Sequence, residues 1–462
     1  LNILLGLLSI FSSFISFSQE KIDRSIAPKA KDAPEVNFGE PQRFELENGL
    51  KVFLVENHQL PTVSMSMTVD MDPVIETGHV GLSSMMGDMM SAGTSTRTKS
   101  QIDEAIDFVG ASFYTYSTGF YFSSLSKHTS SILEIASDVL LNPVFPEEEL
   151  EKKKKRQLSG LKSLKTNPSA IASRVEQVLK YGKNHPYGEV EKIEDINNIS
   201  TDLCREYYET YFRPNISYLI IVGDIDLEKS KSLCEQYFGS WVKKEVPKHS
   251  YDFPDTPNGV NVAFVSKPGA VQSVISVFYP IDFKPGAEDN PQVSVMANIF
   301  GGAFSSYLNA NLREDKGYTY GINSRFSANE SDGTFYISTS VEGEATDSAL
   351  TEIFYELENY VDNGITEEEL KFTKNSIANS DALRYETTFQ KANFLSRIQR
   401  YNLDKNYTSL QREELLKLNT NDIKEIAKKN LDKNNLIVVV VGNKYSLKKK
   451  LAKFGKVQEI KL

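Results

Sequence analysis

The side chains that most often carry catalysis are sparse and scattered in this 462-residue sequence. No two histidines have the short spacing of a local metal motif; the five are His58, His79, His128, His185 and His249. No Gly-x-Ser-x-Gly elbow and no glycine-rich phosphate loop occurs. Neither a local histidine-pair metal motif nor serine-nucleophile chemistry is therefore indicated.

Two further groups have weak chemical signals. Cys204 and Cys234 lack metal-site spacing, and we expect two buried thiols, with a disulfide between them as the alternative. Glu76 and His79 could share a helical face as metal ligands, but Gly78 and Gly81 nearby indicate a loop. An exposed loop histidine is the simpler interpretation.

Composition indicates a folded, multidomain protein. Hydrophobic residues make up 40% and charged residues 25% of the chain, which is ordinary for globular proteins. The net charge of −10 argues against nucleic acid as a partner. The basic run at residues 152–156 is most simply a solvated helix face.

The N-terminal region predicts export. Residues 1–19 form an apolar stretch ending in small residues, which is typical of a signal peptide, with an N-terminal core helix as the alternative. Residues 20–41 contain three prolines among charges and predict an extended lead-in. No other run reaches the roughly 20 apolar residues of a membrane span. We therefore expect an exported, periplasmic protein whose mature chain has no transmembrane span.

Strand signals begin after the lead-in. Asn48-Gly49 lies between two strand-like runs within residues 43–55, which predicts a hairpin. At residues 63–69, apolar residues alternate with serine and threonine, which predicts a strand with one buried face. These three runs in sequence predict an antiparallel sheet.

An internal repeat divides the chain. Glu-Glu-Glu-Leu occurs at residues 147–150 and again at 367–370, and a Val-Gly pair ending an apolar run recurs at Gly223 and Gly442. The offsets are nearly equal, and long helical stretches fill both halves. We predict an α+β fold with domains at 42–244 and 259–462, joined by a proline-containing linker at 245–258.

Six segments carry a family resemblance. They are Gly-Leu-Ser-Ser-Met-Met-Gly-Asp-Met-Met-Ser-Ala-Gly-Thr at 81–94, Phe-Pro-Glu-Glu-Glu-Leu at 145–150, His-Pro-Tyr-Gly at 185–188, Arg-Pro-Asn-Ile-Ser-Tyr-Leu-Ile-Ile-Val-Gly-Asp at 213–224, Phe-Gly-Gly at 300–302 and Leu-Arg-Glu-Asp-Lys-Gly-Tyr-Thr-Tyr at 312–320. Together they resemble the pitrilysin/insulinase family of zinc metallopeptidases, the inverzincins. The resemblance extends over the whole mature chain. It implies two homologous halves, each a mixed or antiparallel sheet with helices on one side, facing each other in a clamshell.

The resemblance also implies that the metal chemistry has been lost from this chain. The family helix carries His-x-x-Glu-His, in which both imidazoles bind zinc and the glutamate is the general base. Ser84, Gly87 and Asp88 occupy those positions, and Gly160 stands near the expected third ligand. Flanking methionines keep the segment amphipathic, so we expect the helix without its cofactor.

The residues that the family uses from its second half are retained in this sequence. Arg313 and Tyr320 match the family residues that contact the bound peptide and the oxyanion across the cleft. Family substrates add as a strand to a sheet edge, which corresponds here to residues 110–117. The family's Asn-Ala pair is replaced there by Tyr114-Thr115.

The leading hypothesis is a non-zinc subunit of a two-chain metallopeptidase, inactive alone and paired with a homologous subunit that carries the zinc. Peptides would be the substrates. The alternative is an inactive pseudopeptidase that binds peptides or scaffolds a complex, as the family's respiratory-complex core subunits do. The least favoured hypothesis is an active enzyme with an unrecognised site.

Overall fold

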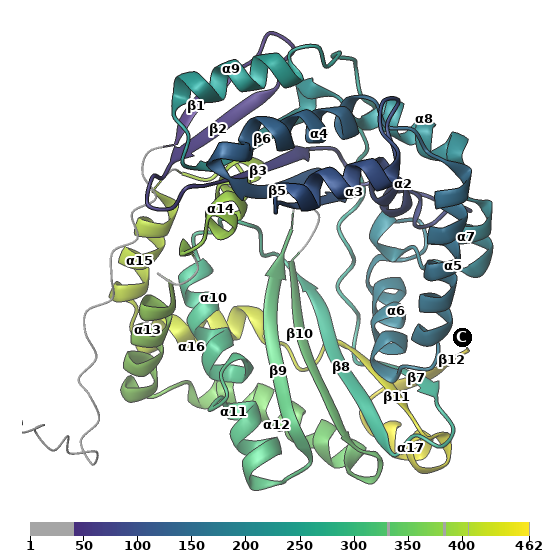
Figure 1. Cartoon of the computed structure of the whole chain (residues 1–462). Helices are drawn as coiled ribbons and strands as arrows, with labels where there is room; N and C mark the ends of the chain where they lie inside the picture. The colour runs from purple at the N-terminus through teal and green to yellow at the C-terminus, as the bar shows by residue number, and fades with distance from the viewer. Residues whose placement is uncertain (1–40, 330–332, 382–384, 405, 462) are drawn as a thin grey trace, which may run out of the picture. The chain divides into compact units, whose positions relative to one another are not determined.

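The computed structural model describes residues 41–329, 333–381, 385–404 and 406–461. The predicted signal peptide and all but the last residue of the predicted lead-in lie outside these described residues. The described chain forms two six-stranded mixed sheets with helices packed on them (Figure 1). The α+β fold class is therefore confirmed, whereas the clamshell arrangement stays a prediction.

The first sheet has the strand order β1-β2-β6-β3-β5-β4. Its strands are β1 (Gln42–Glu45), β2 (Lys51–Glu56), β3 (Thr62–Val69), β4 (Ser112–Tyr116), β5 (Gly119–Leu125) and β6 (Ser217–Gly223). The helices of this half are α2 (Leu82–Met90), α3 (Lys99–Phe108), α4 (Thr129–Leu141), α5 (Glu147–Leu164), α6 (Pro168–Tyr181), α7 (Ile193–Asn198), α8 (Thr201–Tyr211) and α9 (Leu227–Phe238), with short η2 (Ser126–His128), η3 (Pro186–Gly188) and η4 (Pro214–Ile216).

The second sheet has the order β12-β7-β11-β8-β10-β9. Its strands are β7 (Asn261–Ser266), β8 (Gln272–Ile281), β9 (Thr319–Ala328), β10 (Gly333–Glu342), β11 (Ile437–Gly442) and β12 (Lys456–Ile460). The helices are α10 (Asn290–Ala297), α11 (Tyr307–Asn309), α12 (Thr346–Asn363), α13 (Glu367–Asp381), α14 (Thr388–Arg400), α15 (Tyr407–Lys417), α16 (Thr420–Asn430) and α17 (Lys444–Leu451), with short η5 (Asn298–Gly302), η6 (Ala310–Asp315) and η7 (Gly343–Ala345).

The two sheets share one topology, which confirms the internal repeat. Apart from the outermost strands β1 and β12, each position in one order has its counterpart in the other. The repeated Val-Gly pairs end β6 and β11, which are buried along their whole length and pair in parallel with β2 and β7. Burial on both faces explains why these strands are nearly uninterrupted apolar runs.

The hairpin prediction is confirmed, but two other strand predictions are wrong. β1 pairs antiparallel with β2, and Gly49 takes a φ of 90° in the connecting turn. β2 and β3 are not neighbours, because β6 lies between them and makes the sheet mixed. β3 is buried on both faces, since Ser64 Oγ lies 2.9 Å from Thr388 Oγ1 of α14.

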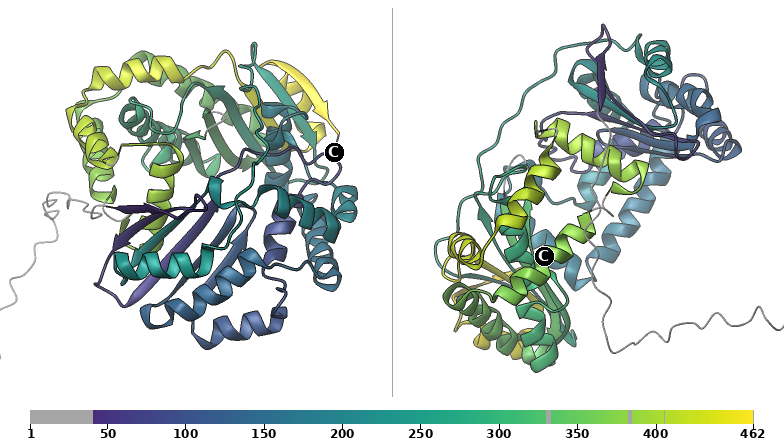
Figure 2. Two further views of the ribbon diagram at one scale, coloured as in Figure 1. Left: turned by 90° about the horizontal axis from the view of Figure 1, so that it is seen from above. Right: turned by 90° about the vertical axis from the view of Figure 1, so that its left-hand side faces the viewer.

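Each half contributes one helix to the other half's sheet. Apolar side chains of α6 pack on strands of the second sheet: Ile171, Ala172 and Val175 contact a cluster that includes Val274, Phe278 and Val439. In the same way, Ala392 and Leu395 of α14 pack on Phe53, Tyr218 and Ile220 of the first sheet. Figure 2 shows helices of the first half, among them α4 and α9, on the opposite face of its sheet.

The segment 245–258 contains neither helix nor strand. It is nevertheless tied to the first half at His249, whose backbone N–H donates to Asp72 Oδ2 over 2.9 Å. The hydroxyl of Tyr211 lies 3.1 Å from His249 Nε2. The composition that predicted a linker therefore corresponds to an irregular but anchored strap.

The two cysteines are buried and unpaired with each other, as expected for structural thiols. Cys204 lies in α8 and Cys234 in α9, within the core of the first half. Burial raises the pKa of each thiol to about 12. Both are therefore poor nucleophiles at neutral pH.

A buried carboxylate fixes the loop that follows α2. Asp138 of α4 accepts hydrogen bonds from Thr94 Oγ1 at 2.6 Å, Thr96 Oγ1 at 2.7 Å and Arg97 Nη1 at 2.8 Å, and a further one from Asn142. Burial alone would raise the pKa of Asp138, but these bonds outweigh it and the pKa is lowered. The charged form is thus the one that the fold stabilises.

A pH dependence follows from the lowered pKa of Asp138. Its contribution to the free energy of unfolding is present above the ordinary value of 3.8 and is lost as pH falls through the lower folded value. Asp138→Asn should therefore destabilise the protein at neutral pH, and its deficit relative to wild type should shrink in acid. Urea unfolding followed by Trp241 fluorescence at stepped pH measures this. A deficit that stays constant in acid would contradict it.

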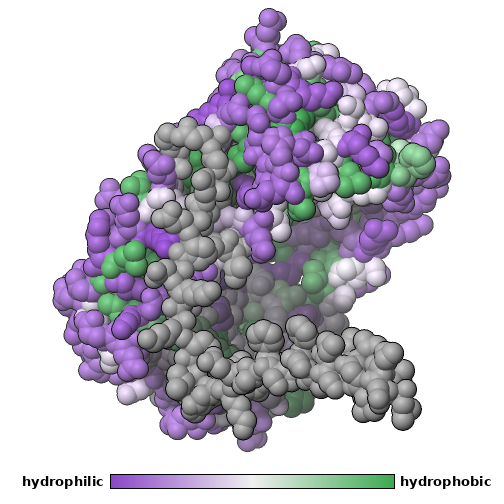
Figure 3. All heavy atoms as spheres, turned by 60° about the vertical axis from the view of Figure 1, so that its left-hand side comes forward, coloured by the Kyte–Doolittle hydropathy of each residue, from purple (hydrophilic) through white to green (hydrophobic). Residues whose placement is uncertain are grey.

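The surface visible in Figure 3 is mainly hydrophilic, with separate hydrophobic patches. Among the described residues, no helix combines the length and apolar character needed to cross a bilayer.

Candidate functional site

Helix α2 forms at the position where the family resemblance places the metal helix. It follows Gly81, which has a φ of 101°, and Glu76 caps its first turn by accepting hydrogen bonds from the Gly81 and Ser83 backbone N–H groups at 2.7 and 2.8 Å. The apolar face that the sequence predicted is buried, through Met85, Met86, Met89 and Met90. The Glu76 carboxylate therefore serves as a cap.

The three α2 positions that the family uses for two zinc ligands and the general base differ in their environment. Ser84 and Asp88 are exposed, one turn apart on the outer face of α2. Gly87 is buried against the end of the edge strand β4. A Cβ atom built on Gly87 would lie 2.4 Å from both the Ser117 nitrogen and the Tyr116 carbonyl carbon. The position that the resemblance assigns to the general base is therefore filled by backbone, and no side chain fits there.

The residues around α2 do not fit a catalytic zinc ion. Ser84 and Asp88 supply no nitrogen ligand, which catalytic zinc sites favour. Lys153 of α5 lies close enough to Asp88 to interact with it electrostatically. Burial lowers the pKa of the Lys153 ammonium, and the charge of Asp88 opposes this only in part. A cation at this place would repel a metal ion. Among the residues that the structure describes, no three His, Cys, Asp or Glu side chains are grouped to hold one.

Gly160, expected near the third ligand, lies exposed on α5. A Cβ atom there would meet nothing within 4 Å. The two glycines at family positions are therefore physically different, since Gly87 is needed for a close contact and Gly160 is not.

Arg313 lies in the π-helical segment η6 and stacks on an aromatic ring. Its guanidinium carbon is 3.8 Å from the centre of the Phe304 ring. Its Nη1 is 2.9 Å from Glu314 Oε1, an ion pair without hydrogen-bond geometry. Phe304 itself is 72% exposed. The Arg313 side chain is half-buried, its Nη1 is inaccessible to solvent, and the stack on Phe304 fixes the plane of the guanidinium, a group that can bind an anionic or carbonyl oxygen.

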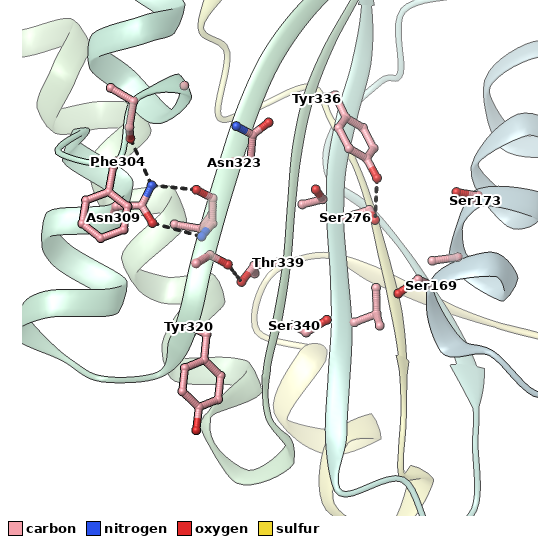
Figure 4. Close-up of a pocket in the computed structure, with 17 residues that line it drawn as sticks. Ser169, Ser173, Ser276, Phe304, Asn309, Tyr320, Asn323, Tyr336, Thr339 and Ser340 are labelled. Atoms are coloured by element: carbon pink, nitrogen blue, oxygen red, sulfur yellow. Dashed lines mark hydrogen bonds between the residues drawn. The ribbon is translucent and has the colours of Figure 1, made fainter.

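Tyr320 begins the exposed part of the edge strand β9 and is 95% exposed. It lines the mouth of a pocket of about 580 Å³, together with Phe304. In Figure 4 the Tyr320 ring points away from the side chains deeper in this pocket. Arg313 does not line this pocket, but Phe304, on which it stacks, lines the pocket together with Tyr320.

The pocket wall is rich in hydroxyl and amide groups. Tyr336 Oη lies 3.3 Å from Ser276 Oγ and 3.4 Å from Glu176 Oε1 of α6, and burial raises the pKa of Glu176. Ser169 and Ser173 of α6 face the strands across the pocket (Figure 4). The lining can therefore exchange hydrogen bonds with a polar, uncharged group.

A side chain covers part of the free edge of β9. The amide of Asn309 accepts a hydrogen bond from the Ile322 backbone N–H at 3.2 Å and donates one to the Ile322 carbonyl at 2.8 Å. It thereby imitates a neighbouring strand at one residue. Near the Tyr320 end of the strand, Thr319 Oγ1 accepts a hydrogen bond from the Gly321 backbone N–H at 3.0 Å and lies 2.8 Å from the Gly321 carbonyl oxygen.

The edge strand that corresponds to family peptide capture is present as β4. It is the outermost strand of its sheet and pairs with β5 alone. Tyr114 is exposed on it, whereas Thr115 Oγ1 lies 3.3 Å from Ser91 Oγ beside α2. The C-terminal end of β4 lies against Gly87 and occupies the space that a general-base side chain would need.

Sequence reasoning missed two residues of this region, Phe304 and Asn309. An aromatic residue two positions after the Gly301-Gly302 pair was an available signal for Phe304. Nothing in the sequence distinguishes Asn309 from the chain's other asparagines, because its role depends on the strand that it meets.

Comparisons with known proteins agree on one family. The model described as "Insulinase (Peptidase family M16)" matches residues 51–184, and the model described as "Peptidase M16 inactive domain" matches residues 198–377. The chain is 25% identical over 357 residues to "Uncharacterized zinc protease YmxG" of Bacillus subtilis, covering 76% of this chain and 86% of that protein.

The names of a further relative and of a solved structure describe proteins without peptidase activity. The "Non-peptidase homolog YmxG" of Helicobacter pylori is 20% identical over 323 residues, covering 69% of this chain and 74% of that protein. The crystal structure of a peptidase M16 inactive domain from Pseudomonas fluorescens superposes with a TM-score of 0.80 at 22% identity, covering 87% of this chain and 98% of that one. At this identity the structural likeness shows the fold alone.

Proposed function

Because this chain belongs to the M16 (insulinase) family of peptidases, we propose that it is the non-zinc subunit of a two-chain metallopeptidase in the periplasm. A homologous partner would carry zinc on an intact His-x-x-Glu-His helix. This chain would supply contacts to the peptide and to the developing oxyanion through Arg313 and Tyr320. Alone it would be inactive.

The observation that carries the proposal is the closure at Gly87. Loss of a ligand by substitution alone would leave space for another residue or a water molecule to act. Here the Tyr116–Ser117 backbone occupies the place of the base, at distances that exclude any Cβ atom. Catalytic chemistry would therefore have to come from another chain.

The second half supports a contributing role. The Tyr320 side chain is almost wholly exposed, and its hydroxyl is available as a donor. The Arg313 guanidinium is pre-positioned by its stack on Phe304. A phenol hydroxyl and a planar cation favour an oxyanion when both are held in place and water is excluded, which a partner surface could achieve.

A scaffold or peptide-binding pseudopeptidase is the second candidate. It is favoured by the free edge of β4 and by the hydroxyl-lined pocket, which need no metal to bind a peptide. Under it, Arg313 and Tyr320 would not affect any turnover.

Isolation of the mature chain from its native envelope tests the proposal. The expected result is a co-purifying M16 chain with an intact His-x-x-Glu-His helix at near-equal stoichiometry, and chelator-sensitive peptide cleavage in the eluate. Recovery of the bait alone, or of partners without that helix and without cleavage, would favour the second candidate.

A further inference from the structure

A cavity of about 740 Å³ lies apart from the sites described above. It is bordered by α6, by the C-terminal end of α5, by the segment that enters α7 and by the edge strand β12, which lie together on one side of Figure 1. It shares no lining residue with the pocket at Tyr320. Its size is that of a small-molecule site.

The floor of this cavity is aliphatic. Six of its lining side chains are Leu164, Ile171, Val175, Val178, Leu179 and Ile460. No aromatic ring is among the described residues that line it, and Gln458 is its one side-chain amide. Such a lining suits a linear hydrocarbon chain better than a flat ring or a polar backbone.

The rim is cationic. Five cationic side chains line the cavity, against two carboxylates, Glu191 and Glu194; they are Lys165, Arg174, Lys183, Lys192 and Lys461. Arg174 already donates a hydrogen bond to the Glu191 backbone carbonyl, whereas the four lysines are exposed. Glu191 already accepts a hydrogen bond from Gln157. In the described part of the chain, the ammonium groups of Lys165, Lys183 and Lys461 have no ion-pair or hydrogen-bond partner. This local excess of positive charge contrasts with the net charge of −10 on the whole chain.

We propose that this cavity binds a fatty acid, with its hydrocarbon chain along the aliphatic floor between α6 and β12 and its carboxylate at the lysine rim. Burial of each methylene group supplies affinity, and the unpaired ammonium groups select the anionic head. Neither contribution needs a metal or a partner chain. The site therefore stands independently of the proposed peptidase role.

Isothermal titration of the mature full chain with dodecanoate, below its micelle concentration, tests the site. Saturable one-to-one binding is expected. Octanoate should bind at least about tenfold more weakly, because four methylene groups are absent. Dodecyltrimethylammonium, with the same chain length and the opposite charge, should also bind at least about tenfold more weakly.

Two matched triple variants separate the rim from general charge effects. Lys165→Gln/Lys183→Gln/Lys461→Gln should raise the Kd for dodecanoate at least tenfold. Lys127→Gln/Lys243→Gln/Lys248→Gln removes the same charge from exposed positions elsewhere and should leave the Kd unchanged. Val178→Trp, which fills the cavity, should abolish binding with the thermal transition retained; if that transition is lost, the rim variants decide.

Equal weakening by both triple variants, or equally tight binding of dodecyltrimethylammonium, would overturn the proposal. So would the absence of saturable binding. A different result would indicate a membrane-surface contact in place of a fatty-acid site. In that result the protein binds anionic lipid vesicles, the Val178→Trp variant binds them equally well, and free dodecanoate does not bind.

Discussion

Gly87→Ala is expected to lower the free energy of unfolding of the first half by about 1–3 kcal/mol, the usual cost of forcing extra volume into a packed core. The added Cβ would lie 2.4 Å from backbone atoms of Tyr116 and Ser117. Backbone in a strand end cannot rotate away as a side-chain tip can. Either α2 or the β4 end must shift, at the expense of the methionine packing beneath it.

The chain provides a matched control in Gly160→Ala. This glycine also lies within a helix, but a Cβ atom there meets nothing within 4 Å. Removal of a mid-helix glycine should raise the free energy of unfolding by about 0.5–1 kcal/mol. Trp241, the chain's one tryptophan, is buried in the same core as α2 and reports both transitions by fluorescence in urea. Equal effects of the two substitutions would contradict the closure.

The same contact predicts that the metal site cannot be restored by its motif. The variant Ser84→His/Gly87→Glu/Asp88→His would carry the family residues, but glutamate has no room at position 87. We expect a destabilised protein with no stoichiometric zinc and no chelator-sensitive cleavage. Zinc at one equivalent in a stable, active variant would show that the β4 end moves aside readily.

Tyr320→Phe is expected to lower the kcat of the proposed two-chain peptidase by about 100-fold, with assembly intact. Loss of one oxyanion donor typically costs a factor of about 10²–10³ in kcat. The substitution removes only a hydroxyl from a side chain that is 95% exposed, so folding should be unaffected. Arg313→Ala should lower kcat/KM as well and should also loosen Phe304, on which it stacks.

Controls for these substitutions come from exposed residues elsewhere. Tyr355→Phe on α12 and Arg205→Ala on α8 change the same groups outside the pocket and should leave kcat and KM as they are. Steady-state kinetics on complexes of matched stoichiometry make the comparison. Wild-type turnover in the Tyr320→Phe complex would show that the Tyr320 hydroxyl does not contact the reacting atoms.

Features with local signals were predictable from the sequence. The Asn48-Gly49 turn, the methionine face of α2 and the repeated ends of β6 and β11 each depend on a few neighbouring residues, and all are found. The loss of the zinc-binding residues from α2 was also predictable, because the family motif fixes the spacing between them.

Features that depend on distant packing were not predictable. Alternation in β3 indicated one buried face, but Thr388, more than 300 residues later, covers the other at Ser64. The closure at Gly87 likewise needs the β4 end to meet α2, and glycine in a helix has no sequence signal for such a contact. Phe304 was overlooked because its partner Arg313 stands on a separate helical segment.

Peptide cleavage by the purified mature chain, with and without its zinc-bearing partner, tests the central claim most directly. The account predicts no chelator-sensitive cleavage by the single chain at any added zinc concentration, and cleavage on addition of the partner that exceeds the partner's own rate. Metal-dependent, chelator-sensitive turnover by the rigorously purified single chain would contradict it.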